Sequence, residues 1–209
     1  MTALKYIFVI IAAYLCGSFS TSVFISTKLY GIDVRNYGSG NAGATNTLRT
    51  LGLKKALVVL LGDALKVVVA ILIARFAGIV YPELIAGMAA IIGHAKPIFY
   101  GFKGGKGVAC ALGFILMFDL LMPIVVLPFF FLAFFMTKII SVATFTAVGA
   151  ALVYIFVRYW GDPVILIFFS CLGAYIIWLH KANVKRLIAG TESKIDFKAK
   201  LLKDVEKKQ

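Results

Sequence analysis

The feature that most constrains the fold is a succession of apolar segments that carry almost no charge. Seven such segments lie at about residues 4–27, 56–77, 84–93, 108–118, 120–136, 139–157 and 164–179. A helix that crosses the hydrocarbon core of a bilayer needs about 20 apolar residues. Segments close to that length occur along most of the chain. The sequence therefore predicts an all-α, polytopic membrane protein.

The third and fourth segments are shorter than a full crossing requires. We therefore expect about seven transmembrane helices, within a range of five to seven. Hydrophobic residues make up 62% of the 209 residues and charged residues 15%, against about 45–50% and 25% in an average soluble domain. This composition excludes a Rossmann enzyme, a P-loop ATPase domain or a nucleic-acid-binding module. We expect a single membrane domain over residues 1–195 and a charged cytoplasmic tail over residues 196–209.

The distribution of lysine and arginine predicts the orientation of the chain in the membrane. If the seven segments are spans, most basic residues fall on one side, and the other side holds Lys5, Arg75 and Arg158. Positive residues collect on the cytoplasmic side. We therefore expect the N-terminus outside and the C-terminus in the cytoplasm. Attraction to anionic lipid headgroups would explain the charge of the tail without a catalytic role.

A polar, glycine-rich stretch on the predicted cytoplasmic side, loop A (residues 35–49), has the sequence RNYGSGNAGATNTLR. Glycines let backbone N–H groups approach an anion, and hydroxyl, amide and guanidinium groups add further donors. Loop A is therefore predicted to bind phosphate, and the alternative is a flexible polar linker. Its candidate phosphate ligands are Gly38, Gly40, Asn41, Gly43, Thr45 and Asn46.

A second glycine-rich stretch, loop B (residues 93–108), has the sequence GHAKPIFYGFKGGKGV. It is not a Walker A loop, because no Ser or Thr follows Lys106 and no βαβ context surrounds it. What remains is a Gly-Gly-Lys-Gly turn that opens a helix at Val108, where free N–H groups and the helix dipole favour an anion. Its candidate phosphate ligands are Lys103, Gly104, Gly105 and Gly107, beside Lys106.

The third polar stretch, loop C (residues 180–192), follows the last apolar segment. If the last helix continues through it, His180 and Asn183 lie one turn apart and can face one site. A histidine at a helix end can equally be an interfacial cap. Ser141, where the fifth and sixth segments meet, is a further candidate for the cytoplasmic pocket.

Asp63 and Lys66 lie three residues apart in the second apolar segment, on one helical face. Ionisable groups inside a membrane are costly and are usually functional or paired. The two residues are therefore expected either to form an ion pair with each other or to contribute to substrate binding.

The three loops resemble the motifs of the bacterial acyl-phosphate:glycerol-3-phosphate acyltransferases, the PlsY family. Loop A resembles the motif Gly-Ser-Gly-Asn-x-Gly-Ala-Thr-Asn with the downstream Arg49. Loop B resembles Gly-His-x-x-Pro-x-Phe followed by Phe-Lys-Gly-Gly-Lys-Gly-Val-Ala, and loop C resembles His-x-x-Asn-x-x-Arg-Leu ending in Gly-x-Glu. Their order and spacing, and the apolar segments between them, agree over nearly the whole chain.

The resemblance implies transfer of a fatty acyl group from acyl phosphate to the 1-hydroxyl of glycerol 3-phosphate, which yields lysophosphatidate and phosphate. The expected partners are fatty acyl phosphate, glycerol 3-phosphate and membrane lipid, at the cytoplasmic side of the bacterial inner membrane. We assign catalytic roles to Ser39, Arg49, Lys106, His180 and Asn183. Substrate binding is assigned to the candidate phosphate ligands named above for loops A and B, together with Asp63, Lys66 and Ser141. Glu192 is assigned a structural role.

An acyl phosphate is already activated, so stabilisation of charge by Lys106 and Arg49 matters more than a strong base. The hydroxyl proton would go either to His180 or to the phosphate of the acceptor. We expect no metal and no cofactor, because no His, Asp and Glu cluster has ligand spacing. The alternative function is a membrane transporter of a small phosphorylated compound, which would need polar or broken-helix features near the middle of the membrane.

Overall fold

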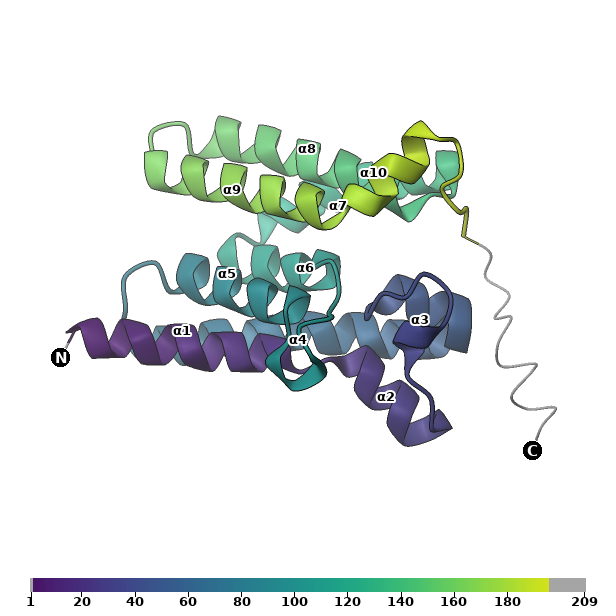
Figure 1. Cartoon of the computed structure of the whole chain (residues 1–209). Helices are drawn as coiled ribbons and strands as arrows, with labels where there is room; N and C mark the ends of the chain where they lie inside the picture. Colours follow the sequence, from purple (N-terminus) through teal and green to yellow (C-terminus); the bar gives the residue numbers. More distant parts are fainter. Residues whose placement is uncertain (1, 196–209) are drawn as a thin grey trace. The chain divides into compact units, whose positions relative to one another are not determined.

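The computed structural model describes residues 2–195, and every regular element in that range is helical. The predicted charged tail, residues 196–209, lies outside the described residues. In chain order (Figure 1) the elements are α1 Thr2–Ser18, α2 Thr21–Tyr30, η1 Val34–Asn36, α3 Ala44–Leu51, α4 Leu53–Phe76, α5 Pro82–Ala95, η2 Ile98–Tyr100, α6 Val108–Phe118, α7 Leu121–Thr137, α8 Ile140–Arg158, α9 Pro163–Leu179 and α10 Lys181–Ile188.

The described chain forms two compact units, residues 2–117 and residues 118–195. The first unit contains α1 to α6 with loops A and B, and the second contains α7 to α10 with loop C. The expectation of one membrane domain over residues 1–195 stays a prediction.

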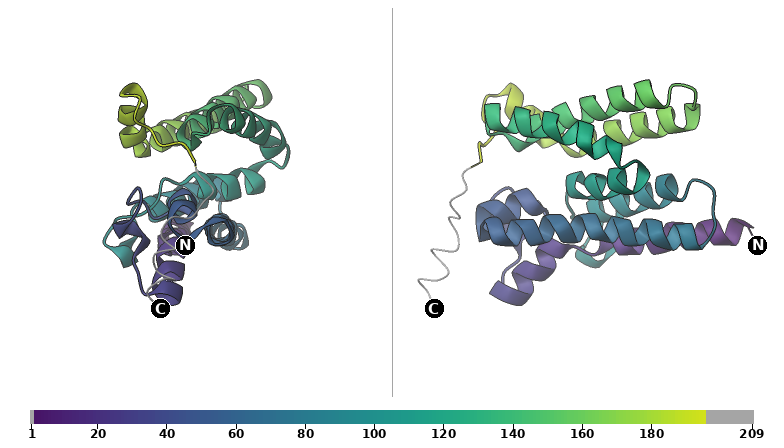
Figure 2. Two further views of the ribbon diagram at one scale, coloured as in Figure 1. Left: turned by 90° about the vertical axis from the view of Figure 1, so that its right-hand side faces the viewer. Right: turned by 180° about the vertical axis from the view of Figure 1, so that it is seen from behind.

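In the first unit, α1 packs closely against α5, and α4 runs along both of them, as the rear view in Figure 2 shows for α1 and α4. The close contact of α1 with α5 depends on two glycines. A Cβ on Gly17 would clash with the carbonyl of Ala90, and a Cβ on Gly93 would clash with the carbonyl of Tyr14. Small residues at these two positions let the helix backbones approach each other.

The first apolar segment was expected as one helix, and the structure interrupts it between Ser18 and Thr21. The Ser20 side chain caps α2 by accepting a hydrogen bond from the Val23 amide at 3.5 Å. At the same break, the Phe19 carbonyl accepts a hydrogen bond from Lys66 Nζ at 2.7 Å. The interruption therefore exposes a backbone acceptor to a charged side chain of α4.

In the second unit, α7 packs on α8 and α8 packs on α9 (Figure 1). The Asp119 carboxylate anchors one end of this bundle, because it accepts hydrogen bonds from the Tyr154 and Tyr159 hydroxyls at 2.6 and 2.9 Å. At the other end, the Ile195 amide donates to the Lys138 carbonyl at 2.8 Å. The segment after α10 is thereby fastened to the turn between α7 and α8.

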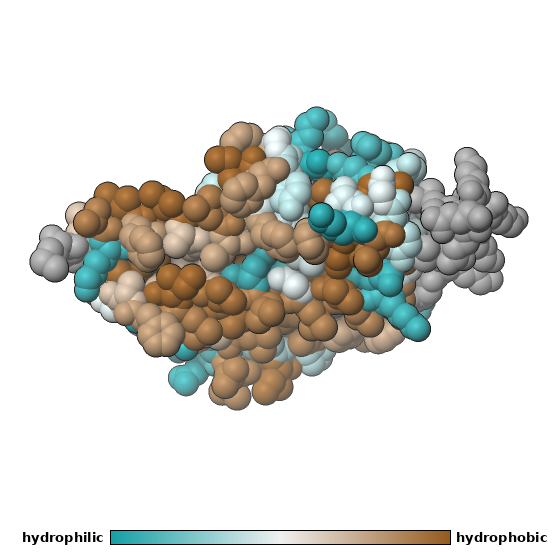
Figure 3. Space-filling model, turned by 90° about the horizontal axis from the view of Figure 1, so that it is seen from below, coloured by the Kyte–Doolittle hydropathy of each residue, from teal (hydrophilic) through white to brown (hydrophobic). Residues whose placement is uncertain are grey.

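Among residues 2–195, three helical stretches, Ala3–Tyr30, Leu53–Phe76 and Ile140–Arg158, are long and apolar enough to cross a membrane, and the bent pair α9 and α10 would make a fourth. The first of these includes α1, α2 and the break between them. The observed helix bounds lie close to those of the predicted segments, and α6 has the predicted bounds, Val108–Phe118. In Figure 3, hydrophobic residues cover much of the visible face of the first unit, whereas polar residues are concentrated toward the end at which α2 lies.

Candidate active site

Loop A is built around Asn46, which is fully buried at the start of α3. Its side-chain oxygen accepts hydrogen bonds from the Ser39 amide at 2.8 Å and the Ser39 hydroxyl at 3.1 Å. Its amide nitrogen donates to the carbonyls of Val34 at 2.9 Å and Tyr37 at 3.1 Å. Gly38, with φ +60°, passes so close to Asn46 that a Cβ would clash with the side-chain oxygen. Asn46 therefore shapes loop A from inside.

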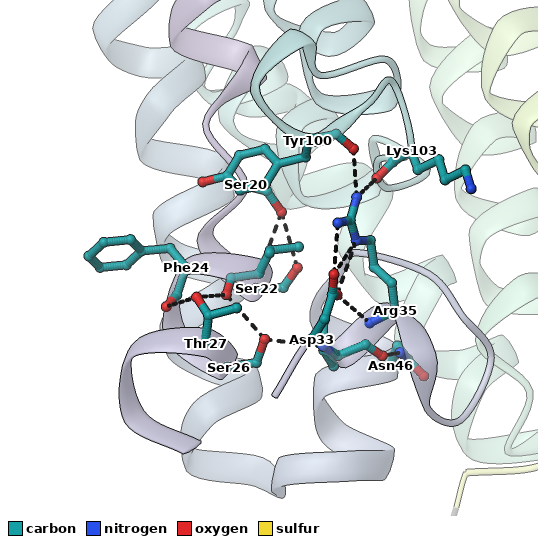
Figure 4. Close-up of polar contacts among 12 residues, drawn as sticks. Ser20, Ser22, Phe24, Ser26, Thr27, Asp33, Arg35, Asn46, Tyr100 and Lys103 are labelled. Atoms are coloured by element: carbon teal, nitrogen blue, oxygen red, sulfur yellow. Dashed lines mark hydrogen bonds and ion pairs between the residues drawn. The ribbon is translucent and has the colours of Figure 1, made fainter. Parts of the chain in front are cut away.

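Loops A and B lie against each other in the first unit. Arg35 donates hydrogen bonds to the carbonyls of Tyr100 at 2.6 Å and Lys103 at 3.1 Å (Figure 4). The Ala42 amide donates to the Gly104 carbonyl at 3.5 Å. The Tyr100 ring packs against a small apolar cluster of Val23, Val34 and Ala42. The structure thus brings together the two stretches that were each predicted to bind phosphate.

Loop B is fastened to the end of α5 through His94, which is 4% exposed. The Gly105 amide donates to the His94 carbonyl at 3.1 Å. A Cβ on Gly105 would clash with His94 Nε2, and a Cβ on Gly104 would clash with the His94 carbonyl. The absence of side chains at Gly104 and Gly105 therefore allows the loop to pack directly onto the histidine.

Asp63 and Lys66 form the expected ion pair on α4, with 2.8 Å between Lys66 Nζ and Asp63 Oδ1. Lys66 Nζ also lies 2.9 Å from His94 Nδ1, and the Thr21 hydroxyl donates to Asp63 Oδ1 at 3.1 Å. Asp63 is 1% and Lys66 8% exposed. The two residues are thus buried within a hydrogen-bond network that reaches His94 of loop B.

Two helices begin at these loops. Gly43 is the N-cap of α3 without a side-chain cap, and α6 begins at Val108, directly after Gly107, which has φ +79°. Helix N-termini favour anions through their N–H groups and their dipoles. Arg49 on α3 and Lys106 before α6 are partly exposed, and Lys103 is exposed. Loops A and B therefore lead into two helix N-termini, with Lys103 and Lys106 before α6 and Arg49 in the last turn of α3.

In the second unit, the Glu192 carboxylate joins α8, α10 and the segment after α10. It accepts hydrogen bonds from the Ser141 hydroxyl at 3.0 Å, the Asn183 amide nitrogen at 2.5 Å and Arg186 Nε at 2.6 Å. Burial raises the pKa of Glu192, but the three hydrogen bonds outweigh it and bring the pKa below its ordinary value. The negative charge of Glu192 is therefore stabilised by these three hydrogen bonds, of which the one from Arg186 is also an ion pair.

His180 lies at the junction of α9 and α10, where the axis bends by 62°. The continuous helix considered for loop C is therefore interrupted, although α10 keeps Asn183 one turn beyond His180. The His180 ring is buried, and Nδ1 lies 2.8 Å from the Ile176 carbonyl. A carbonyl only accepts, so Nδ1 carries the proton in this contact. In the neutral ring, Nε2 is then the basic nitrogen.

Comparisons with known proteins identify the family. A family model described as glycerol-3-phosphate acyltransferase matches residues 7–190. The chain belongs to the glycerol-3-phosphate acyltransferase family. A curated glycerol-3-phosphate acyltransferase from Clostridioides difficile (strain 630) is 40% identical over 202 residues, which cover 93% of this chain and 98% of that protein.

Two crystal structures of PlsY (YgiH), an integral membrane glycerol 3-phosphate acyltransferase, have a similar fold. Its glycerol 3-phosphate form is 38% identical with a TM-score of 0.83, and covers 91% of this chain and 96% of that chain. Its lysophosphatidic acid form is 37% identical with a TM-score of 0.80, and covers 92% and 96%. The predictions of an all-helical membrane protein and of a glycerol-3-phosphate acyltransferase are confirmed.

Within this acyltransferase, the predicted site residues fall into distinct positions. The first unit brings loops A and B together, with Gly40 and Ser39 exposed and Asn41, Gly43 and Thr45 partly buried. The second unit groups Ser141, Asn183 and Glu192 around one carboxylate. The individual roles assigned to these residues stay predictions. In the described residues, no group of His, Cys, Asp and Glu side chains could hold a metal ion.

Two residues that hold loops A and B in place were not assigned to the site from the sequence. Arg35 and His94 both lie in the predicted loops, and the structure shows that they hold those loops in place. The available signal was their position at the edges of glycine-rich motifs. The same types of side chain donate hydrogen bonds to a substrate phosphate or to a backbone carbonyl of the protein. The sequence alone therefore does not separate a ligand role from a structural role.

Proposed function

We propose that this acyltransferase takes its acyl group from a fatty acyl phosphate and that loops A and B bind the phosphate groups of the substrates. The observation that carries the proposal is the contact of the two loops, from which α3 and α6 begin, with Lys103 and Lys106 before α6 and Arg49 in the last turn of α3. Charge-assisted hydrogen bonds from such groups are strong ligands for phosphate oxygens. The lysophosphatidic acid form of PlsY supports an acylated glycerol phosphate as the product of the family.

The proposed reaction is an acyl transfer between two oxygens. The 1-hydroxyl oxygen of glycerol 3-phosphate forms the new ester bond to the acyl carbon, and the bond from that carbon to the phosphate oxygen breaks. Inorganic phosphate leaves with the bonding electrons. Negative charge develops on the acyl oxygen and on the departing phosphate, where Lys106, Arg49 and backbone N–H groups would stabilise it.

For the second unit we propose catalytic roles for His180 and Asn183. The Nδ1 contact with the Ile176 carbonyl fixes the tautomer in which Nε2 accepts a proton. The hydroxyl proton would go either to this nitrogen or to the phosphate of the acceptor. Glu192 orients Asn183 and Ser141 through its hydrogen bonds. If His180→Ala weakens glycerol 3-phosphate binding but leaves turnover intact, the acceptor's phosphate is the base.

The topology belongs to the same proposal. The basic loops favour an N-terminus outside, a C-terminus in the cytoplasm and five to seven spans in the bacterial inner membrane. The acyl chain of the donor would lie in the bilayer, and glycerol 3-phosphate would enter from the cytoplasm. Cysteine labelling of single-cysteine variants at Lys54 and Val80 in intact cells checks the orientation.

The experiment uses the full chain in lipid vesicles with labelled glycerol 3-phosphate and either palmitoyl phosphate or palmitoyl-CoA. We expect lysophosphatidate from palmitoyl phosphate alone, and a loss of at least about 100-fold in kcat/KM for Lys106→Ala and Arg49→Ala. Lys54→Ala, which removes an exposed charge on α4, is the matched control. Product from palmitoyl-CoA alone would overturn the donor assignment. Uptake of glycerol 3-phosphate without product would favour the transporter.

A further inference from the structure

Arg35 occupies an unusual position for an arginine in a glycine-rich, phosphate-binding region. All three nitrogens of its guanidinium group donate to atoms of the protein (Figure 4). Nη1 donates to the carbonyls of Tyr100 and Lys103, while Nε and Nη2 donate to the Asp33 carboxylate at 2.7–3.1 Å. The guanidinium is therefore largely engaged inside the protein.

One of the two carbonyls lies within a single turn of loop B, and the other directly follows that turn. The Tyr100 and Phe102 amides both donate to the Pro97 carbonyl, at 3.2 and 2.9 Å, which makes residues 97–102 a compact turn. Phe102 adopts φ +59°, a conformation that costs free energy for a residue with a side chain. Arg35 binds the Tyr100 carbonyl within this turn and the Lys103 carbonyl directly after it, and so opposes opening of the turn.

Asp33 fixes the other side of the contact. Its carboxylate caps η1 by accepting a hydrogen bond from the Arg35 amide at 2.9 Å, and it also receives the guanidinium. Hydrogen bonding from Arg35 lowers the pKa of Asp33. The pair is about one-quarter exposed, with side-chain exposures of 21% and 27%. Asp33 therefore sets the direction in which Arg35 points.

We propose that Arg35, oriented by Asp33, is a positioning residue that sets the separation of loops A and B and so the affinity for glycerol 3-phosphate. The inference rests on the proposed function of the two loops. Arg35 acts through the backbone of loop B. It binds the Lys103 carbonyl, whereas the Lys103 side chain extends away from Arg35 (Figure 4). Gly104 to Lys106 follow directly, so movement of this turn moves the predicted phosphate ligands.

The test measures KM for glycerol 3-phosphate and kcat in vesicles for Arg35→Gln and Asp33→Asn. Loosening the loops weakens binding in the ground state and the transition state alike, so KM rises while kcat changes far less. We expect KM to rise by about tenfold or more, since hydrogen bonds to a charged group are lost. Asp33→Asn should act in the same direction, because it releases the guanidinium from its orientation. The double variant should be no worse than the more impaired single variant.

A direct phosphate ligand would behave differently. If Arg35 bound the substrate, Asp33→Asn would remove a competing anion and lower KM. A lower KM in Asp33→Asn, or an unchanged KM in Arg35→Gln, overturns the proposal. Should Arg35→Gln fail to fold, Asp33→Asn alone still gives the sign of the effect.

The matched control is Arg75→Gln. Arg75 bridges the Glu83 carboxylate and the Met117 carbonyl at 2.7 and 2.8 Å, which is the same chemistry at the last turn of α4. Its variant should leave KM for glycerol 3-phosphate unchanged. The distance along α4 from its first residue to Arg75 is about 33 Å, so a long-range effect on the loops is not expected.

Hydrogen exchange separates this proposal from the function on which it rests. Amides of residues 98–107 should exchange faster in Arg35→Gln and Asp33→Asn than in the wild type or in Arg75→Gln, and equal exchange overturns the positioning role of Arg35. If Arg49→Ala and Lys106→Ala also keep the wild-type KM and kcat, the proposed function of the loops fails. Exchange would still decide the role of Arg35 in that case.

Discussion

Lys66 Nζ lies 2.9 Å from His94 Nδ1, and this contact joins the middle of α4 to the end of α5. Lys66 Nζ also donates hydrogen bonds to Asp63 and to the Phe19 carbonyl at the break between α1 and α2. An ammonium group has three N–H donors, so each donor of Lys66 has one acceptor here. Because Lys66 only donates, His94 Nδ1 accepts, and Nε2 carries the proton that faces Gly105.

Lys66→Met should strongly destabilise the first unit. The substitution keeps a long apolar stem but leaves the Asp63 carboxylate buried without its partner, which typically costs about 3–5 kcal/mol. Thermal unfolding in detergent measures the effect. Lys54→Met, on the exposed face of the same helix, should change the midpoint little. Asp63→Leu combined with Lys66→Met should be less destabilised than Lys66→Met alone, because no buried charge remains. A double variant as unstable as the single one would contradict this account.

Gly105→Ala should reduce activity severely while the helices still form. The new Cβ would clash with His94 Nε2 and lie 2.8 Å from the Ala42 carbonyl, so loop B must move away from both α5 and loop A. Glycerol 3-phosphate turnover in vesicles, with circular dichroism for helix content, measures the result. Gly149→Ala is the control, since nothing lies within 4 Å of its added Cβ. Wild-type turnover in Gly105→Ala would show that the loop tolerates displacement.

The sequence predicted the helices well because their signal is strong and local. Each apolar segment is bounded by polar or glycine-rich residues, which is why α6 has its predicted bounds. The break between Ser18 and Thr21 lies in the polar run GSFSTS (residues 17–22), a local signal, but it was not predicted because apolar residues continue on both sides of that run. The features that stabilise it, the Ser20 cap and the Lys66 contact, depend on backbone geometry and on a residue far along the chain.

The candidate site was predicted as a set of residues but not as an arrangement. Glycines and polar side chains were expected to face a phosphate, and several of them serve the protein itself. Asn46 forms hydrogen bonds within loop A and to the segment just before it, and the Gly105 amide donates a hydrogen bond to the His94 carbonyl. Such long-range contacts leave no periodic pattern in a sequence, so a scaffold residue and a ligand residue look alike until the structure places them.

Asn46→Asp tests the scaffold role of Asn46. The carboxylate could still accept from Ser39, but its second oxygen would face the carbonyls of Val34 and Tyr37, which now receive no hydrogen bond. Leaving buried acceptors unsatisfied costs about 1–3 kcal/mol, and more when a charge is involved. We expect faster proteolysis within loop A and a lower unfolding midpoint. Asn36→Asp, on an exposed position of η1, is the matched control. Equal proteolysis of the two variants would mean that Asn46 is dispensable for the loop.

The hydrogen bonds of Glu192 predict an acid-sensitive second unit. The folded-state pKa of Glu192 lies below its ordinary value of 4.5. A carboxyl group of this kind contributes stability above its unfolded pKa, and the contribution is lost as the pH falls through the folded pKa. Wild-type stability should therefore decline as the pH falls below about 5, and the decline should be smaller in Glu192→Gln. At pH 7, Glu192→Gln should be less stable, because the charged bond to Arg186 is gone.

Both tryptophans, Trp160 and Trp178, lie in the second unit, so tryptophan fluorescence during thermal unfolding reports on the unit that contains Glu192. The difference between wild type and Glu192→Gln should be largest at neutral pH and should shrink as the pH falls through the folded-state pKa, because the wild-type carboxyl then also becomes neutral. A difference that stays constant with pH would mean that shape, and not charge, makes Glu192 necessary. A difference that grows on acidification would reverse the sign of the predicted linkage and contradict the lowered pKa.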